Sequence, residues 1–201
     1  APDFEVVVVN PSLLLGPGDL RGSSTVDVRR FLDREILATP RGGLALVDVR
    51  DVATAMVAAM ERGKAGERYI LSAANLTVAA FFDRLARLSG VPAPHLSLPR
   101  SPAVATFATR AFSKLVLAIG GELPAEATSV EMAQYFWYCD SSKAMGELGF
   151  SPRDVADTLS DTVSDLVGRG IAHPRAGAGA GGDGTVAPFF VQQPFGTPER
   201  P

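Results

Sequence analysis

Residues 5–11 read Glu-Val-Val-Val-Val-Asn-Pro, and this stretch decides the fold class. The four β-branched valines predict a strand over 5–9, and Pro11 predicts its end because proline cannot donate a hydrogen bond to a central ladder. An uninterrupted apolar run is typical of a parallel strand that is covered on both faces. Such a strand needs neighbouring strands and helices, which predicts an α/β fold.

Helices and strands alternate downstream of this strand. Short apolar runs over 44–47 and 68–71 predict two more strands, and this rhythm favours parallel pairing. Apolar residues at helical spacing predict helices that follow Ser23–Thr25, Asp48, Thr77, Asp140 and Ser151, with another over 101–119. The second of these helices is expected to pack through one face, made of Val52, Met56, Val57 and Met60.

Composition narrows the function classes. The chain has 201 residues, 46% of them hydrophobic, and a net charge of −3, so it lacks the basic surface that nucleic-acid binding requires. A single cysteine, Cys139, and two histidines provide no set of side chains spaced for a metal, and they fit a reducing, cytoplasmic location. The first residues do not have the pattern of a signal peptide. Arg110 and Lys114 interrupt the apolar stretch 101–119, so a packed helix is favoured over a membrane span.

The composition of the chain changes beyond Pro174. Residues 174–201 are rich in glycine, alanine and proline and carry no periodic pattern, so they are expected to form a disordered tail. Residues 1–173 are then the folded part. Phe136, Trp137 and Tyr138 are expected in the core of a small C-terminal lobe, and a stacking platform for bases is not expected because no basic groove accompanies them.

Three segments carry a resemblance to a known family. The first is residues 6–19, Val-Val-Val-Val-Asn-Pro-Ser-Leu-Leu-Leu-Gly-Pro-Gly-Asp. The second joins residues 46–53, Leu-Val-Asp-Val-Arg-Asp-Val-Ala, to residues 66–71, Gly-Glu-Arg-Tyr-Ile-Leu. The third joins residues 140–144, Asp-Ser-Ser-Lys-Ala, to residues 147–152, Glu-Leu-Gly-Phe-Ser-Pro. In this order and spacing they resemble the extended short-chain dehydrogenases/reductases, and within them the dihydroflavonol-reductase-like and NAD-dependent epimerase/dehydratase proteins.

The resemblance implies the C-terminal part of a Rossmann-type, doubly wound parallel sheet with a small, mainly helical substrate lobe. It implies NAD or NADP as cofactor, held mostly by an N-terminal nucleotide-binding half that is expected to be absent, so binding to this chain alone is not expected. Two family signatures are missing: no glycine-rich turn follows a strand, and Tyr69, Tyr135 and Tyr138 lack a lysine four residues later. No catalytic residue or metal ligand is therefore assigned within the chain, and both signatures are expected upstream.

The resemblance also places the cofactor and the substrate. The predicted contacts to the nicotinamide end of the cofactor are Asn10, Pro11, Ser12 and Leu13. The predicted contacts to a cofactor phosphate or substrate anion, at a helix start, are Ser23, Ser24 and Thr25. The predicted substrate contacts are Leu14, Leu15 and Arg50. An ordinary turn explains the first set equally well, and helix capping explains the second set and Asp48.

The expected function is hydride transfer between NAD(P)(H) and a carbonyl or alcohol carbon of a small molecule. Epimerisation or dehydration of a sugar nucleotide is the second expectation. A non-catalytic fragment that acts as a partner-binding subunit is an alternative of another class. A homodimer, or association through the exposed edge of the Val6–Val9 strand, is also expected because an uncovered apolar edge invites pairing.

Overall fold

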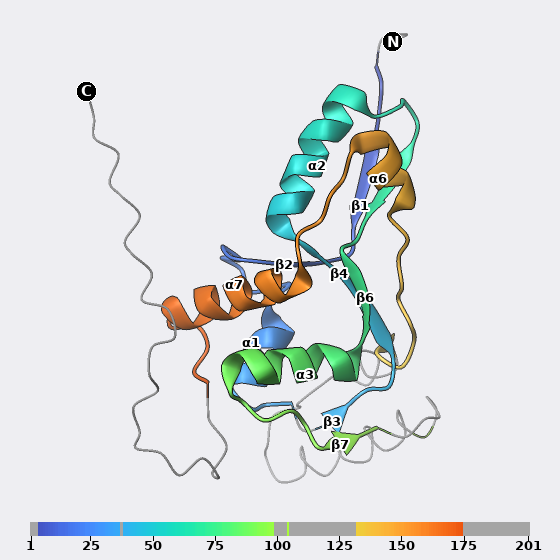
Figure 1. Cartoon of the computed structure of the whole chain (residues 1–201). Helices are drawn as coiled ribbons and strands as arrows, with labels where there is room; N and C mark the ends of the chain where they lie inside the picture. The colour runs from blue at the N-terminus through green and yellow to red at the C-terminus, as the bar shows by residue number, and fades with distance from the viewer. Residues whose placement is uncertain (1–3, 37, 99–103, 105–131, 175–201) are drawn as a thin grey trace, which may run out of the picture.

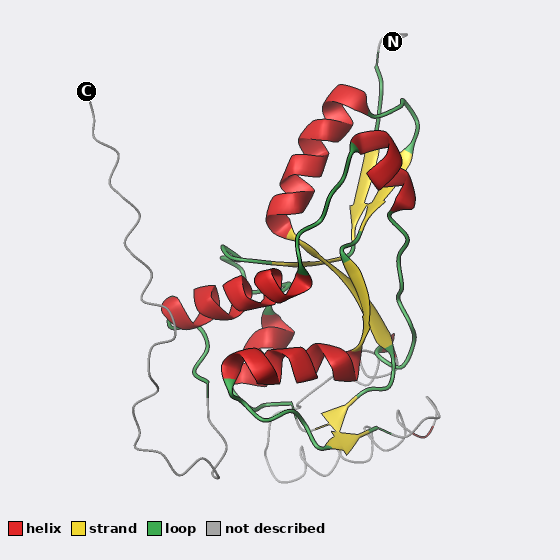
Figure 2. Cartoon of the chain, viewed as in Figure 1, coloured by secondary structure: helices red, strands yellow, loops and turns green. Residues whose placement is uncertain are grey.

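The computed structural model describes residues 4–36, 38–98, 104 and 132–174, in which strands and helices alternate along the chain (Figure 1). The strands are β1 (Val8–Pro11), β2 (Leu13–Leu15), β3 (Ala38–Thr39), β4 (Gly43–Asp48), β5 (Arg68–Leu71), β6 (Ala74–Thr77) and β7 (Leu96–Ser97). The helices are α1 (Val26–Leu32), α2 (Val49–Arg62), α3 (Val78–Ser89), α6 (Ser142–Leu148) and α7 (Val155–Gly168). Figure 2 shows helices packed around the crossing strands, which confirms the predicted α/β class.

Two extended segments pass from one sheet into another. β1 is parallel to β5, and the ladder ends where Pro11 pairs with Leu71. The first segment then continues as β2, which is parallel to β4, and the second continues as β6, which is antiparallel to β4. The predicted parallel strand is confirmed, although it begins at Val8. The predicted end at Pro11 is confirmed, because proline occupies the last position of the β1 ladder, and beyond Ser12 the chain continues as a separate strand, β2.

The first hydrophobic core joins β2 and β4 to α1, α3 and α7. Phe31 of α1 stacks on Phe82 of α3 with ring centroids 5.4 Å apart, and Leu159 of α7 is fully buried beside them. Thr77 caps α3 by accepting the N–H of Ala80, as its position predicted. Helix α1 ends at Leu32, one turn earlier than the apolar pattern through Ile36 predicted.

The second core places α2 and α6 against β1 and β5. Helix α2 presents Val52 and a row of alanines to the strands, while Met56 and Val57 are about half exposed and Met60 is 87% exposed. The predicted packed face of α2 is therefore wrong apart from Val52. Two stripes of this helix have helical spacing, and the alanine stripe lets the helix lie close to the strands, which the bulkier methionines would prevent.

The pair β1 and β5 is covered on one face only among the described residues. Tyr69 and Leu71 are buried under the helices, whereas Ile70, on the opposite face, is 41% exposed. Val6, just before β1, is 48% exposed. Within the described chain β1 also has β5 as its single neighbour. One strand edge and one apolar face are thus open here.

The two C-terminal helices confirm the prediction with small shifts in their starts. Ser141 occupies the N-cap position of α6, and Asp140 accepts the N–H of Ser142. Asp154, rather than Ser151, caps α7 by accepting the N–H of Ala156. The predicted helix over 101–119 and the predicted tail over 174–201 lie outside the described residues, apart from single positions.

Candidate functional site

The predicted nicotinamide contacts lie where β1 passes into β2. Asn10 and Pro11 are exposed at the end of β1, and Ser12 donates its N–H to the carbonyl of Leu71 at 2.9 Å. Leu13 is already the first residue of β2. The carboxyl ends of parallel strands are the edge at which nucleotide-binding folds hold their ligands, so the place agrees with the predicted role. The four contacts themselves stay predictions.

Leu14 and Leu15 are packed into the two cores. Leu15 is 2% exposed among the residues of the first core, and Leu14 packs against the second. Successive side chains of a strand point to opposite faces, so a leucine run within a strand fills both sides of the sheet. The substrate contact predicted for Leu15 therefore finds no support, because its side chain is enclosed by protein.

The predicted anion site at Ser23, Ser24 and Thr25 already contains a carboxylate. Asp19 accepts the N–H groups of Ser24 and Thr25 at 3.1 and 3.2 Å and the Thr25 hydroxyl at 3.1 Å. Burial alone would raise the pKa of Asp19, but the hydrogen bonds from Thr25, Gly22 and Ser24 outweigh it and hold that pKa below its usual value. A phosphate would have to displace this carboxylate, so the phosphate contact of these residues stays a prediction.

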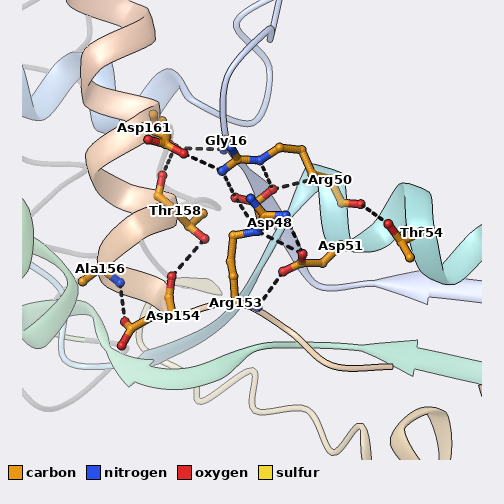
Figure 3. A network of polar contacts seen from close by, with 11 residues as sticks. Gly16, Asp48, Arg50, Asp51, Thr54, Arg153, Asp154, Ala156, Thr158 and Asp161 are labelled. Carbon is orange, nitrogen blue, oxygen red and sulfur yellow. Dashed lines mark hydrogen bonds and ion pairs between the residues drawn. The ribbon is translucent and has the colours of Figure 1, made fainter. Parts of the chain in front are cut away.

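Arg50 forms the centre of a polar network at the end of β4 (Figure 3). Its guanidinium donates to both carboxylate oxygens of Asp48, at 2.9 and 2.7 Å, and to Asp161 of α7 at 2.7 Å. Asp48 is completely buried and also caps α2 by accepting the N–H of Arg50, which confirms its predicted capping role. Two carboxylates already engage Nε and Nη2 of Arg50, so a substrate phosphate would have to compete with them, and the predicted substrate contact stays a prediction.

A second arginine closes the network from the segment before α7. Arg153 donates its side-chain Nε–H and its backbone N–H to Asp51, both at 2.9 Å, and its Nε lies 3.6 Å from Asp48. Asp51 is buried on the first turn of α2. The two arginines and three carboxylates therefore join the end of β4, the start of α2 and helix α7.

Helix α7 also holds the turn after β2. The buried N–H of Gly16 donates to the hydroxyl of Thr162 at 2.9 Å, and that hydroxyl donates to the carbonyl of Thr158 at 2.7 Å. Gly16 has φ of +128°, and a Cβ at this position would lie 2.9 Å from a methyl carbon of Val49. Only glycine fits both the backbone conformation and the space. The turn beyond the predicted cofactor segment is thus fixed by a helix about 150 residues away.

The electrostatics of the network favour a structural role, in which the charged groups hold β4, α2 and α7 together, over a role in acid–base catalysis. Burial raises the pKa of Asp48, but hydrogen bonds from Arg50 and Thr158 and the charge of Arg50 lower it by more. The hydrogen bond with Asp48 raises the pKa of Arg50 above its usual value. These groups stay charged near neutral pH and are already paired with one another, so they neither take up nor release a proton readily.

Several of these residues had no signal in the sequence. Asp161, Thr162 and Arg153 sit at ordinary positions of a helix and its approach, and their partners lie more than 100 residues away. Only Asp19 had a local cue, since it follows a Gly-Pro-Gly turn directly before a helix start.

The aromatic residues expected in a core lie on the surface. Tyr135, Phe136, Trp137 and Tyr138 are between 48% and 58% exposed, so the predicted core position of Phe136, Trp137 and Tyr138 is wrong. Aromatic composition alone predicts burial, but here the backbone of this segment runs along β4 as an edge.

The described residues contain neither a candidate membrane span nor a candidate metal site. No helix in that part of the chain combines the length and the apolarity needed to cross a bilayer. The same residues bring no group of three metal-ligating side chains together.

Comparisons with known proteins identify the family. A protein of Synechocystis sp. assigned as a dihydroflavonol 4-reductase is 35% identical over 164 residues, which are 79% of this chain and 47% of that protein. The chain corresponds to part of an extended short-chain dehydrogenase/reductase. Sterol demethylase protein B of Methylococcus capsulatus is 26% identical over 84% of this chain and 52% of its own length. The chain thus spans about half the length of the curated relatives it matches, and no family model matches it.

Solved structures of the family show the same partial fold. A nucleoside-diphosphate-sugar epimerase from Pseudomonas aeruginosa superposes with a TM-score of 0.67 at 27% identity, over 86% of this chain and 51% of that one. The described α/β arrangement is therefore part of a Rossmann-type fold. More distant structures of this fold were solved with bound cofactor, a UDP-glucuronic acid 4-epimerase from Bacillus cereus with NAD and RMD from Pseudomonas aeruginosa with NADPH.

Proposed function

We propose that this chain supplies the substrate side of an NAD(P)-dependent oxidoreductase that reduces a ketone or aldehyde, or oxidises the corresponding alcohol. The observation that carries the proposal is the 35% identity to the Synechocystis relative, whose name is that of a dihydroflavonol 4-reductase. That match extends over 164 residues, 79% of this chain.

The residues at the end of β1 fit the nicotinamide end of such a cofactor. Asn10 and Pro11 are exposed at the carboxyl edge of a parallel strand, and the turn beyond them is held rigidly through Gly16 and Thr162. When bound, NAD(P)H supplies the hydride. In this proposal Asn10–Leu13 orient the nicotinamide by their backbone groups, and the proton donor and pyrophosphate cradle come from residues outside the printed sequence.

Sugar-nucleotide epimerisation is the second candidate because one structural neighbour is a nucleoside-diphosphate-sugar epimerase. The polar network weighs against it. A sugar nucleotide carries two phosphates, and the arginine that resemblance offered for them, Arg50, is held by Asp48 and Asp161. Releasing Arg50 would take from the completely buried Asp48 its nearest charged partner and leave it only Arg153, at 3.6 Å, which costs stability.

The first experiment reads the coding region upstream of Ala1 and assays the protein that it encodes together with this chain. We expect a glycine-rich turn after a strand and a Tyr-x-x-x-Lys helix. We further expect NADH or NADPH to be consumed with a ketone and not with a UDP-sugar. An upstream region that encodes neither signature would remove the catalytic proposal.

A partner-binding role without catalysis is favoured by one observation, the open edge of β1 beside the exposed Val6 and Ile70. The discriminating measurement is a titration of the isolated 201 residues with NADPH. The partner-binding role requires no measurable affinity, and none is expected because the sequence has no glycine-rich turn after a strand to hold the pyrophosphate. Saturable binding of NADPH would count against it.

A further inference from the structure

Residues 135–138, Tyr-Phe-Trp-Tyr, form a surface that we call the aromatic strip. All four side chains are about half exposed, although each would gain by burial. The strip is held firmly by its backbone. Gly43 donates its N–H to the Tyr135 carbonyl at 3.0 Å, and Trp137 donates its N–H to the Gly43 carbonyl at 2.9 Å. A contiguous apolar surface that stays exposed and is held in place by the backbone is typical of a binding site.

Two rings of the aromatic strip are seated directly on the sheet. Phe136 and Tyr138 meet edge to face, with centroids 5.4 Å apart and an interplanar angle of 76°. They lie over Gly43, where any Cβ would overlap both rings. Glycine therefore lets the rings rest on the backbone of β4 in one orientation, so that their exposed surfaces are set before a ligand arrives.

The aromatic strip lies near the predicted end of the cofactor. At Gly43, β6 lies along one edge of β4 and Phe136 lies along the other. Further along β4, this second edge is occupied by β2. On that edge Leu13 pairs with Leu46, three residues along β4. At strand spacing this separation is about 10 Å, the length of a fused ring system.

The chemistry of the aromatic strip selects the class of ligand. Residues 132–139, Met-Ala-Gln-Tyr-Phe-Trp-Tyr-Cys, contain no charged side chain. Four half-exposed aromatic side chains offer roughly 300–500 Å², given about 150–250 Å² for each. A stable protein interface needs about 800 Å² from each partner, so the area fits a small molecule.

We propose that the aromatic strip binds a flat, apolar ring ligand, with Phe136 and Tyr138 as its main contacts. Binding of such a ligand does not depend on the proposed function. Only the identification of the ligand with the reacting ketone or alcohol rests on the proposed function. Ring faces recognise flat apolar surfaces with little loss of conformational entropy, because each ring has only two rotatable bonds.

Trp137 is the single tryptophan of the chain, so its fluorescence reports on the aromatic strip alone. The 201-residue chain is titrated, without cofactor, with androsterone, a steroid ketone, and with 2-decanone, a linear ketone. We expect a saturable change of Trp137 emission with androsterone and none with 2-decanone over the same concentrations. Isothermal titration calorimetry measures the same two affinities independently.

Variants link binding to the two rings. Phe136→Ala is expected to weaken androsterone binding about tenfold, the loss of one good aromatic contact. Phe136→Leu keeps an apolar side chain that is not flat, and it is expected to lose nearly as much androsterone affinity. It replaces the alanine variant in the test if that variant does not melt cooperatively. Met60→Ala is the matched control, because Met60 is an exposed apolar residue on α2, away from the strip. It is expected to bind as the parent chain does.

The outcomes separate this inference from the proposed function. An unchanged emission with androsterone, equal binding of 2-decanone, or parental affinity in both Phe136 variants would overturn the inference. A change of emission with chain concentration alone would overturn it in favour of self-association through the strip. Binding without NADPH-dependent turnover in the assay of the encoded protein would leave the inference in place and remove the reductase proposal.

Discussion

The sheet of β2, β4 and β6 and the pair β1 and β5 share two extended segments, yet they differ in how they are covered. In β4 every residue except Leu44 is buried, and the strand ends on the paired charges around Asp48. In β5 buried and exposed residues alternate, and β1 has one free edge within the described chain. The middle strand of the first sheet is therefore enclosed by the chain itself, whereas the second sheet leaves a strand edge and an apolar face open to association. We expect substitutions to change stability in the first and association in the second.

The largest effect is expected at Asp48. Asp48→Asn removes the charge that faces Arg50 inside the protein, and it should lower the free energy of unfolding by about 3–5 kcal/mol. Urea denaturation measures this loss. The matched control is Asp161→Asn, since Asp161 pairs with the same arginine but is 43% exposed, and its loss should stay at about 0–1 kcal/mol. Equal losses of unfolding free energy in the two variants would show that burial does not determine how much each ion pair with Arg50 contributes to stability.

The pH dependence of stability follows from the same carboxylate. The pKa of Asp48 is lowered on folding, so its contribution is complete above its ordinary pKa of about 3.9 and is lost as the pH falls through the lower folded value. The difference in unfolding free energy between the parent and Asp48→Asn should therefore be constant near neutral pH and narrow below about pH 4. A difference that narrowed on raising the pH instead would assign the effect to another group.

A smaller loss is expected where α7 holds the turn after β2. Thr162→Val keeps the shape of the side chain but leaves the buried N–H of Gly16 without its acceptor, which should cost about 1–3 kcal/mol. Amide hydrogen exchange at Gly16 should accelerate in the variant. The control is Thr54→Val on α2, because the Thr54 hydroxyl donates to the carbonyl of Arg50 at an exposed position. If both variants unfolded at the same urea concentration, the turn would not depend on α7.

The same contrast explains which features could be predicted from sequence. β4, α3 and α7 were predictable because each has one dominant apolar pattern, and α3 also has a recognisable cap in Thr77. The packed face of α2 was not, because its methionine and alanine stripes have the same helical spacing. The end of β1 at Pro11 was predictable, because proline is excluded from the interior of a ladder and accepted at its last position.

The candidate site was predictable only where its chemistry is local. Asp48 has a capping position in the sequence, and Asn10–Pro11 end a strand. One of the partners of Arg50, Asp161, lies on α7, more than 100 residues away. A tertiary contact over such a distance produces no periodic pattern in the sequence. The exposure of the aromatic strip depends on the pairing of Gly43 with a segment about 90 residues later, which composition does not encode.

The smallest effect on stability is expected on the open face of β1 and β5, where the effect on association should be largest. The parent chain is expected to self-associate, because an unpaired strand edge beside exposed Val6 and Ile70 can be buried against a second copy. Ile70→Lys places a charge on that face and should leave the unfolding free energy within about 0.5 kcal/mol, because the side chain is already 41% exposed. Sedimentation velocity should then show a shift from oligomer to monomer, while Met60→Lys on the outer face of α2 should leave the oligomer intact. A parent chain that sediments as a single monomer and melts cooperatively would mean that the open face does not drive association.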